Sequence, residues 1–243
     1  MKEAGSPHQT PLSTYAGFIS YSQMDKTWAR RIHRALEAYR LPTGMPELGA
    51  QRKRLGRFFR DDDELAGAPS LGTALEGAID DSAALIVICS PNSASSKWVD
   101  AEIRRFKRRG PDAKVFAIIV GGRPDATSDD EQCFPPSLLF RVDADGNLTD
   151  TPDEPLAPDV SKDSFARLIT RVVAGLIGVE FDSLWQRERR RRRRRAVLSG
   201  VALACLAAAA VAGFVIIDRA NTSELIARAE QRATEAQIVS SPI

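Results

Sequence analysis

Short apolar runs alternate with amphipathic segments over most of the chain, and this alternation constrains the fold more than any other feature. Each run is rich in β-branched or aromatic residues, whereas each intervening segment repeats its apolar residues at helical spacing. The predicted strands are 16–22, 57–59, 83–90, 114–120 and 138–142. The predicted helices are about 25–39, 70–80, 96–109 and 162–178. Such an alternation is typical of repeated β-α units.

Five parallel strands joined by crossover helices predict an α/β domain, a flavodoxin-like doubly wound five-stranded parallel sheet. The carboxyl ends of parallel strands meet at one edge of the sheet, and ligands bind beyond that edge. We therefore expect the functional loops to follow Ser22, Phe59, Ser90 and Val120.

The chain of 243 residues is long enough for one core with appended segments. The three cysteines are far apart and odd in number, so neither a disulfide framework nor a zinc site is expected. The N-terminus has no apolar region typical of a cleaved secretory signal. The predicted organisation is a disordered 1–14, a domain at 15–178, an Arg-rich 179–195, a transmembrane helix at 196–217, and a short tail at 218–243 with a weak helical pattern.

The transmembrane prediction rests on residues 196–217, a run of 22 residues without a charge, which is about the length that crosses a bilayer. The arginines at 189–195 outnumber the three that follow the run, so the positive-inside rule predicts a single-pass membrane protein with a cytoplasmic N-terminal domain. Anionic membrane lipid is the expected partner of these arginines. Nucleic acid, which the same arginines could bind through phosphates, is not expected as a partner and stays an alternative.

Several common sites are missing from the sequence. It contains no Rossmann fingerprint, no P-loop and no nucleophile elbow. A phosphorylated receiver domain needs acidic residues at the end of its first strand and after its third strand. At these positions this chain has SYS (20–22) and CS (89–90). Residues 143–147, DADGN, lack the glycine and glutamate positions of a calcium loop and predict a turn, so no metal site is expected.

Three segments in order then resemble the boxes of Toll/interleukin-1 receptor (TIR) domains. They are FISYS at 18–22, RDDDELAGAP at 60–69, and CSP at 89–91 continuing to WVDAEI at 98–103. The resemblance covers about 15–178 and is strongest to bacterial TIR proteins in which an arginine run and one transmembrane helix follow the domain. It implies one of two functions, a self-associating adaptor or an enzyme that cleaves NAD at the nicotinamide–ribose bond.

The resemblance also implies roles for individual residues. In enzymatic members the catalytic glutamate lies four residues after a tryptophan, which gives Glu102 and Trp98 here. The implied substrate-binding residues are Phe18, Ser20, Trp98, Arg60 and Asp61. The implied gating and self-association loop contains Asp62, Asp63, Glu64, Leu65, Gly67 and Pro69. NAD is then a substrate, and no cofactor is expected.

The chemistry of this bond suits a single carboxylate. The cationic nicotinamide leaves as a neutral molecule and needs little acid catalysis, while the ribose develops positive charge that a fixed carboxylate can stabilise. On the predicted helix, Trp98 and Glu102 form a stripe about 100° from the apolar stripe at Val99, Ile103 and Phe106.

Simpler interpretations stay open. Glu102 could be a solvated carboxylate or pair with Arg105, and Trp98 and Phe18 could belong to the core. The segment 60–69 could be a solvated acidic loop that caps the following helix through Ser70. The expected function is NAD cleavage by a self-associated, membrane-tethered TIR domain in signalling or defence, with NAD and other TIR domains as partners. The alternative is a non-enzymatic scaffold that acts through TIR–TIR association.

Overall fold

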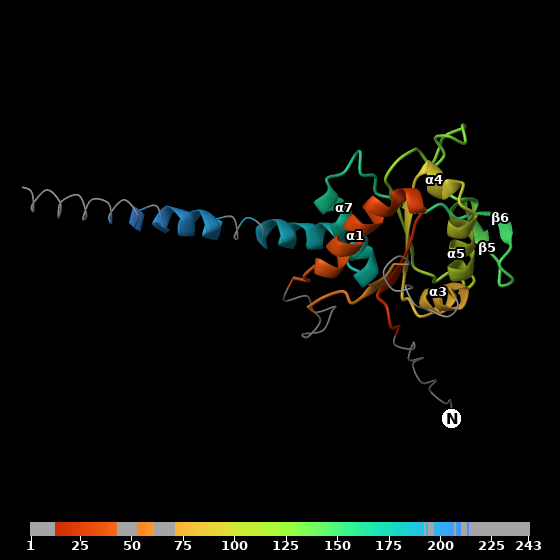
Figure 1. The fold of residues 1–243 in the computed structure, drawn as a ribbon, viewed down its shortest axis with the longest axis horizontal. Coiled ribbons are helices and arrows are strands. Elements are labelled where there is room, and N and C mark those ends of the chain that lie inside the picture. Colours follow the sequence, from red (N-terminus) through yellow and green to blue (C-terminus); the bar gives the residue numbers. More distant parts are fainter. Residues whose placement is uncertain are drawn as a thin grey trace, which may run out of the picture. The chain divides into compact units, whose positions relative to one another are not determined.

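A four-stranded parallel sheet forms the centre of the domain (Figure 1). The computed structural model describes residues 13–42, 53–60, 71–191, 193, 197–206, 208–209 and 213. The chain divides into two compact units, Met1–Gln186 and Arg187–Ile243. The sheet lies in the first unit, in the order β2-β1-β3-β4. Its strands are β1 (Gly17–Ser20), β2 (Phe58–Phe59), β3 (Leu85–Cys89) and β4 (Val115–Ile119).

Helices cover both faces of this sheet (Figure 1). One face carries α1 (Lys26–Ala38) and α7 (Phe165–Ile177), and the other carries α3 (Leu71–Asp80) and α5 (Lys97–Lys107). The ends of these four helices differ from the predicted ends by at most three residues, so the predicted helices are confirmed. Short elements connect them: η1 (Gln23–Asp25), α4 (Pro91–Ala94) and α6 (Pro136–Leu139).

The period of two along each strand divides the core between the two faces. Ile19 and Ile86 pack on the α1 and α7 side, whereas Phe18 and Leu85 pack on the other side. Each of these four side chains is at most 1% exposed. Because both faces of β3 are covered, this strand is a continuous apolar run and not an alternation of apolar and polar residues.

Helix α5 is held to the sheet by one apolar stripe. Ser96 caps the helix, its hydroxyl accepting from the Val99 backbone N–H at 3.4 Å. Val99, Ile103 and Phe106, which we call the α5 stripe, are each at most 1% exposed. They lie at i, i+4 and i+7, so they share one face of the helix, and the predicted buried stripe is confirmed.

The predicted fifth parallel strand at 138–142 is wrong. Residues 136–139 form α6, and β5 (Phe140–Val142) pairs antiparallel with β6 (Leu148–Pro152) in a separate two-stranded sheet. The predicted turn between them is confirmed, since the Asp143 carboxylate accepts from the backbone N–H groups of Asp145 and Asn147 at 2.9 and 2.8 Å. A connection this short joins antiparallel strands, because a parallel pair needs a crossover of a dozen or more residues.

Residues near 159 occupy the position beside β4 where a fifth strand would lie. The Ile119 N–H donates to the Pro158 carbonyl at 2.9 Å, and the Val160 N–H donates to the Ile119 carbonyl at 3.0 Å. This is an isolated parallel bridge and not a strand. Among the described residues the parallel sheet therefore has four strands.

The predicted transmembrane helix at 196–217, and with it the predicted single-pass membrane location, is wrong. Across the ranges that the structure describes, no helix combines the length and the apolar character needed to cross a bilayer.

The α5 stripe should dominate the stability of the first unit. Replacing Ile103, which is 0% exposed, by Ala should lower the free energy of unfolding by about 2–5 kcal/mol, because it leaves a cavity under the helix. The exposed Ala101 on the same helix is the matched control, and Ala101→Gly should lower it by only about 1 kcal/mol. Denaturant unfolding of the full chain measures both. Equal losses for the two variants would contradict this account.

Candidate functional site

The side chains of Ser20 and Glu102 meet at the carboxyl end of β1. Ser20 is the last residue of β1 and is 1% exposed. It points to the same face of the sheet as Phe18, two residues earlier, and α5 covers that face. There the Ser20 hydroxyl donates a hydrogen bond of 2.5 Å to the Glu102 carboxylate. The fold therefore brings together two predicted site residues that lie 82 positions apart in sequence.

A second polar pair lies between neighbouring loops at the same edge. The Ser90 hydroxyl, directly after β3, donates to the Asp25 carboxylate at 2.5 Å, and Asp25 is 7% exposed. Ser90 also caps α4 in a capping box with Ser93. The pair therefore ties the loop after β1 to the loop after β3. Neither Asp25 nor Ser90 was predicted as a site residue, although functional loops were expected after Ser22 and Ser90.

Trp98 lies one helical turn before Glu102 on α5 and is 78% exposed. Its ring is thus available at the surface and is not part of the core. Met24, in η1, is 79% exposed. Both η1 and α5 contact α4, so these two residues belong to elements that neighbour the same short helix.

Phe18 belongs to the sheet core, which was the open alternative for this residue. It is 1% exposed and stacks on Phe59, with ring centroids 5.4 Å apart. Arg60, directly after β2, is 3% exposed. The other predicted residues of this segment lie outside the described residues; they are Asp61, Asp62, Asp63, Glu64, Leu65, Gly67 and Pro69.

Arg105 does not pair with Glu102, contrary to the simpler interpretation of that carboxylate. Its guanidinium binds Asp80 at 2.6 Å and Glu76 at 2.9 Å, and both of these residues lie on α3. The hydrogen bond from Arg105 is also the main reason why the pKa of Asp80 lies below its ordinary value. The helix that carries Glu102 is thus joined to α3 on its outer side.

Asp100 joins α5 to α6. Its carboxylate accepts from the Ser137 backbone N–H at 3.0 Å and from the Arg104 guanidinium at 2.6 Å. Burial is the largest single influence and acts to raise the pKa of Asp100, but the hydrogen bonds from Ser137 and Arg104 together outweigh it. The pKa of Asp100 therefore lies below its ordinary value of 3.8.

Neither buried cysteine is suited to nucleophilic chemistry. Burial raises the pKa of the Cys89 thiol well above its ordinary value and raises that of Cys133 to about 11. A thiol of this kind is protonated at neutral pH and is a poor nucleophile. Within the part of the chain that the structure describes, no group of three His, Cys, Asp or Glu side chains could hold a metal ion.

A comparison with models of known protein families shows the family to which the chain belongs. The family model described as TIR domain matches residues 18–154. The chain belongs to the TIR domain family. The match contains Ser20, Trp98 and Glu102, so the site described above lies within the TIR domain.

One curated relative and two solved structures are similar to parts of the chain. The NAD(+) hydrolase ApTIR of Actinoplanes sp. (strain ATCC 31044 / CBS 674.73 / SE50/110) is 30% identical over 109 residues, which is 44% of this chain and 14% of that protein. The TIR domains of the activated Roq1 resistosome, solved directly recognizing the pathogen effector XopQ, are 25% identical with a TM-score of 0.33, over 44% of this chain and 58% of that chain. The TIR domain of the Toll-related receptor TRR-2 of Hydra magnipapillata is 17% identical with a TM-score of 0.32, over 47% and 76%.

The Asp25–Ser90 pair should stabilise the TIR domain. Ser90→Ala removes the α4 cap and one hydrogen bond to a buried carboxylate, so we expect a loss of about 1–3 kcal/mol in the free energy of unfolding. Ser95→Ala is the control, because Ser95 is exposed at the end of α4 and should change the stability by less than about 0.5 kcal/mol. Denaturant unfolding of the two variants compares them, and a neutral Ser90→Ala would show that the pair does not hold the loops.

The pKa of Asp100 predicts an acid-sensitive contribution to stability. A carboxyl group whose folded pKa is depressed stabilises the fold above its unfolded pKa, and this stabilisation is lost as pH falls through the folded pKa. For Asp100 the stabilising contribution should begin to fall near pH 3.8 and should continue to fall at lower pH. Asp100→Asn should therefore be less stable than the wild type at neutral pH, and the difference should shrink as pH falls below 3.8. Unfolding measured at a series of pH values tests this, and a difference that grows on acidification would contradict it.

Proposed function

We propose that this TIR domain cleaves NAD at the nicotinamide–ribose bond, with Glu102 as the carboxylate that stabilises the ribose as positive charge develops. The observation that carries the proposal is the partly buried hydrogen bond of 2.5 Å from Ser20 to Glu102 at the carboxyl edge of the sheet. Ligands of doubly wound sheets bind beyond this edge. A carboxylate held in one orientation there needs little reorganisation when charge develops beside it.

The proposed reaction breaks the bond between C1′ of the ribose and the pyridinium nitrogen. The bonding electrons go to nicotinamide, which leaves as a neutral molecule, and the ribose becomes oxocarbenium-like. Water then attacks C1′ and loses a proton, which gives ADP-ribose; attack by a nucleophile of the same molecule gives a cyclic product. Both outcomes begin with the same cleavage, so one carboxylate serves both.

Ser20 is proposed as a positioning residue and Trp98 as a binding residue. The Ser20 hydroxyl restricts rotation of the Glu102 carboxylate by its hydrogen bond. Trp98 is exposed on the same side of α5 and offers a flat apolar face to a ring of the substrate. The similarity to a protein named NAD(+) hydrolase supports the assignment, over a stretch that is 44% of this chain.

We further propose that self-association switches the activity on. Trp98 and Met24 are large apolar side chains that are 78% and 79% exposed on two elements that both contact α4, and exposed apolar side chains on neighbouring elements suit a surface that another protein covers. A second copy of the domain at this surface would exclude water from the side chain of Glu102. The same surface also suits a non-enzymatic scaffold, which is the second candidate function.

Glu102→Gln should abolish most of the nicotinamide release, because an amide cannot stabilise the ribose cation. We expect a loss of about 10²- to 10³-fold in kcat. Ser20→Ala should lower kcat by about tenfold or more, because the carboxylate is no longer held in place. Glu131→Gln is the control, since Glu131 pairs with Arg123 on an exposed loop. This substitution should leave the rate of nicotinamide release unchanged. Nicotinamide release from the full chain, followed over a range of protein concentrations, measures all three variants.

Two results of this experiment would reject parts of the proposal. A wild-type chain that releases no nicotinamide at any concentration would favour the scaffold. A rate per molecule that is already maximal for the monomer would support NAD cleavage and would contradict activation by self-association.

A further inference from the structure

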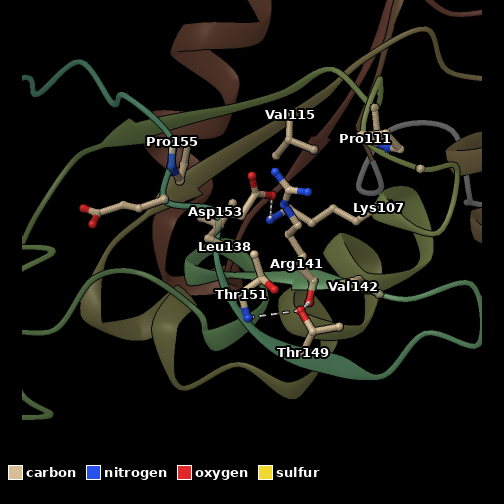
Figure 2. A pocket seen from close by; sticks show the side chains of 13 residues that line it. Lys107, Pro111, Val115, Leu138, Arg141, Val142, Thr149, Thr151, Asp153 and Pro155 are labelled. Carbon is tan, nitrogen blue, oxygen red and sulfur yellow. Dashed lines mark hydrogen bonds and ion pairs between the residues drawn. The ribbon is translucent and has the colours of Figure 1, made fainter.

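A pocket of 510 Å³ lies between the end of α5, the start of β4 and the β5–β6 hairpin. Figure 2 shows the side chains that line it. The pocket opens beside Val115, the first residue of β4, whereas Ser20 lies at the opposite end of the sheet. It shares no residue with the candidate site. Its volume is within the range of about 300–1,000 Å³ that is usual for small-molecule sites.

Lys107 brings a desolvated charge to this pocket. Its side chain is 9% exposed, and its ammonium group donates to the Asp153 carboxylate at 2.9 Å and to the Phe140 carbonyl at 3.1 Å. An ammonium group has three N–H donors, so these two bonds use two of them. Burying a charged amine is costly unless it is paired, and these partners account for its position.

Arg141 brings a second cation from the middle of β5. Figure 2 shows its guanidinium within the pocket, beside Lys107 and Asp153. Among the described residues, no hydrogen bond or ion pair involves this guanidinium, although the Arg141 backbone carbonyl accepts from the Thr149 hydroxyl at 3.2 Å. A guanidinium presents five N–H donors in a planar fork that fits a carboxylate or a phosphate in a bidentate manner.

The other residues that line the pocket limit the kind of anion that it can bind. Asp153 and Glu154 balance the formal charges of Lys107 and Arg141, so a polyphosphate would face two carboxylates. Apolar walls complete the pocket; they come from Pro111, Ala113, Val115, Leu138, Val142 and Pro155. A ligand with one anionic group and an apolar or ring-shaped remainder matches this mixture of one guanidinium, which has no protein partner among the described residues, and apolar surface.

We propose that this pocket binds a small organic anion, a molecule with one carboxylate or phosphate group that the Arg141 guanidinium grips and a ring that the apolar walls enclose. Thr151, which also lines the pocket, adds a hydroxyl donor to it. The site is independent of NAD cleavage at Glu102, because no side chain contributes to both.

Two matched pairs of probes test the proposal on the full chain by NMR. AMP carries a phosphate that adenosine lacks. Nicotinate carries a carboxylate where nicotinamide carries a neutral amide. We expect AMP, nicotinate or both to shift the backbone amide signals of Gly110, Thr149 and Thr151 in a saturable manner with a Kd below about 1 mM. The uncharged member of each pair should leave these signals unchanged. The anion that binds identifies the group as a phosphate or a carboxylate.

Arg141→Gln should weaken this binding by about tenfold or more, because it removes the charged fork. Arg123→Gln is the matched control, since it removes the same charge from an exposed arginine that pairs with Glu131 outside the pocket. Glu102→Gln should leave the shifts of Gly110, Thr149 and Thr151 intact, so failure of NAD cleavage and failure of this site are distinguishable.

Three results would overturn the proposal. The first is no saturable shift of the three amide signals with either anion. The second is equal binding by adenosine or nicotinamide. The third is unchanged binding in Arg141→Gln, whose amide spectrum shows whether the variant is folded.

Discussion

Burial of the α5 stripe against the sheet fixes the direction of every other side chain on this helix, because a helix that buries one face has no freedom to rotate. With the stripe inward, Glu102 lies on one side and meets Ser20 at the end of β1. Arg105 lies on the outer side and meets α3, and Lys107 reaches the hairpin. One hydrophobic contact thus places the candidate site, the link to α3 and the Lys107 side of the pocket beside the hairpin.

The polar interactions around this helix have different physical roles. The ion pairs of Arg105 with Glu76 and Asp80 are partly exposed, and such pairs contribute about 0–1 kcal/mol each. The bond from Ser20 to Glu102 involves a donor that is 1% exposed, so its main consequence is orientation of a carboxylate. Stability therefore comes chiefly from apolar burial, and the polar bonds determine where charge is presented to a ligand.

Local patterns predicted the four covering helices and four of the strands, because burial on both faces of a sheet leaves continuous apolar runs and amphipathic helices. The run at 138–142 has the same composition but belongs to a hairpin, and the turn at 143–147 was the signal that the strand could not continue a parallel sheet. The transmembrane prediction for 196–217 rested on composition alone, and no helix among the described residues is long and apolar enough to cross a bilayer.

The sequence by itself determined that Glu102 and Trp98 lie on the same side of a helix next to its buried stripe, since helical spacing is a local property. It also determined the order of the three boxes that mark the TIR family. Only the tertiary structure decided that Glu102 is bound by Ser20 and not by Arg105, and that Arg141 faces Lys107 in a pocket. These contacts depend on the register of α5 and of the hairpin against the sheet, which the packing of the whole core sets and no local period encodes.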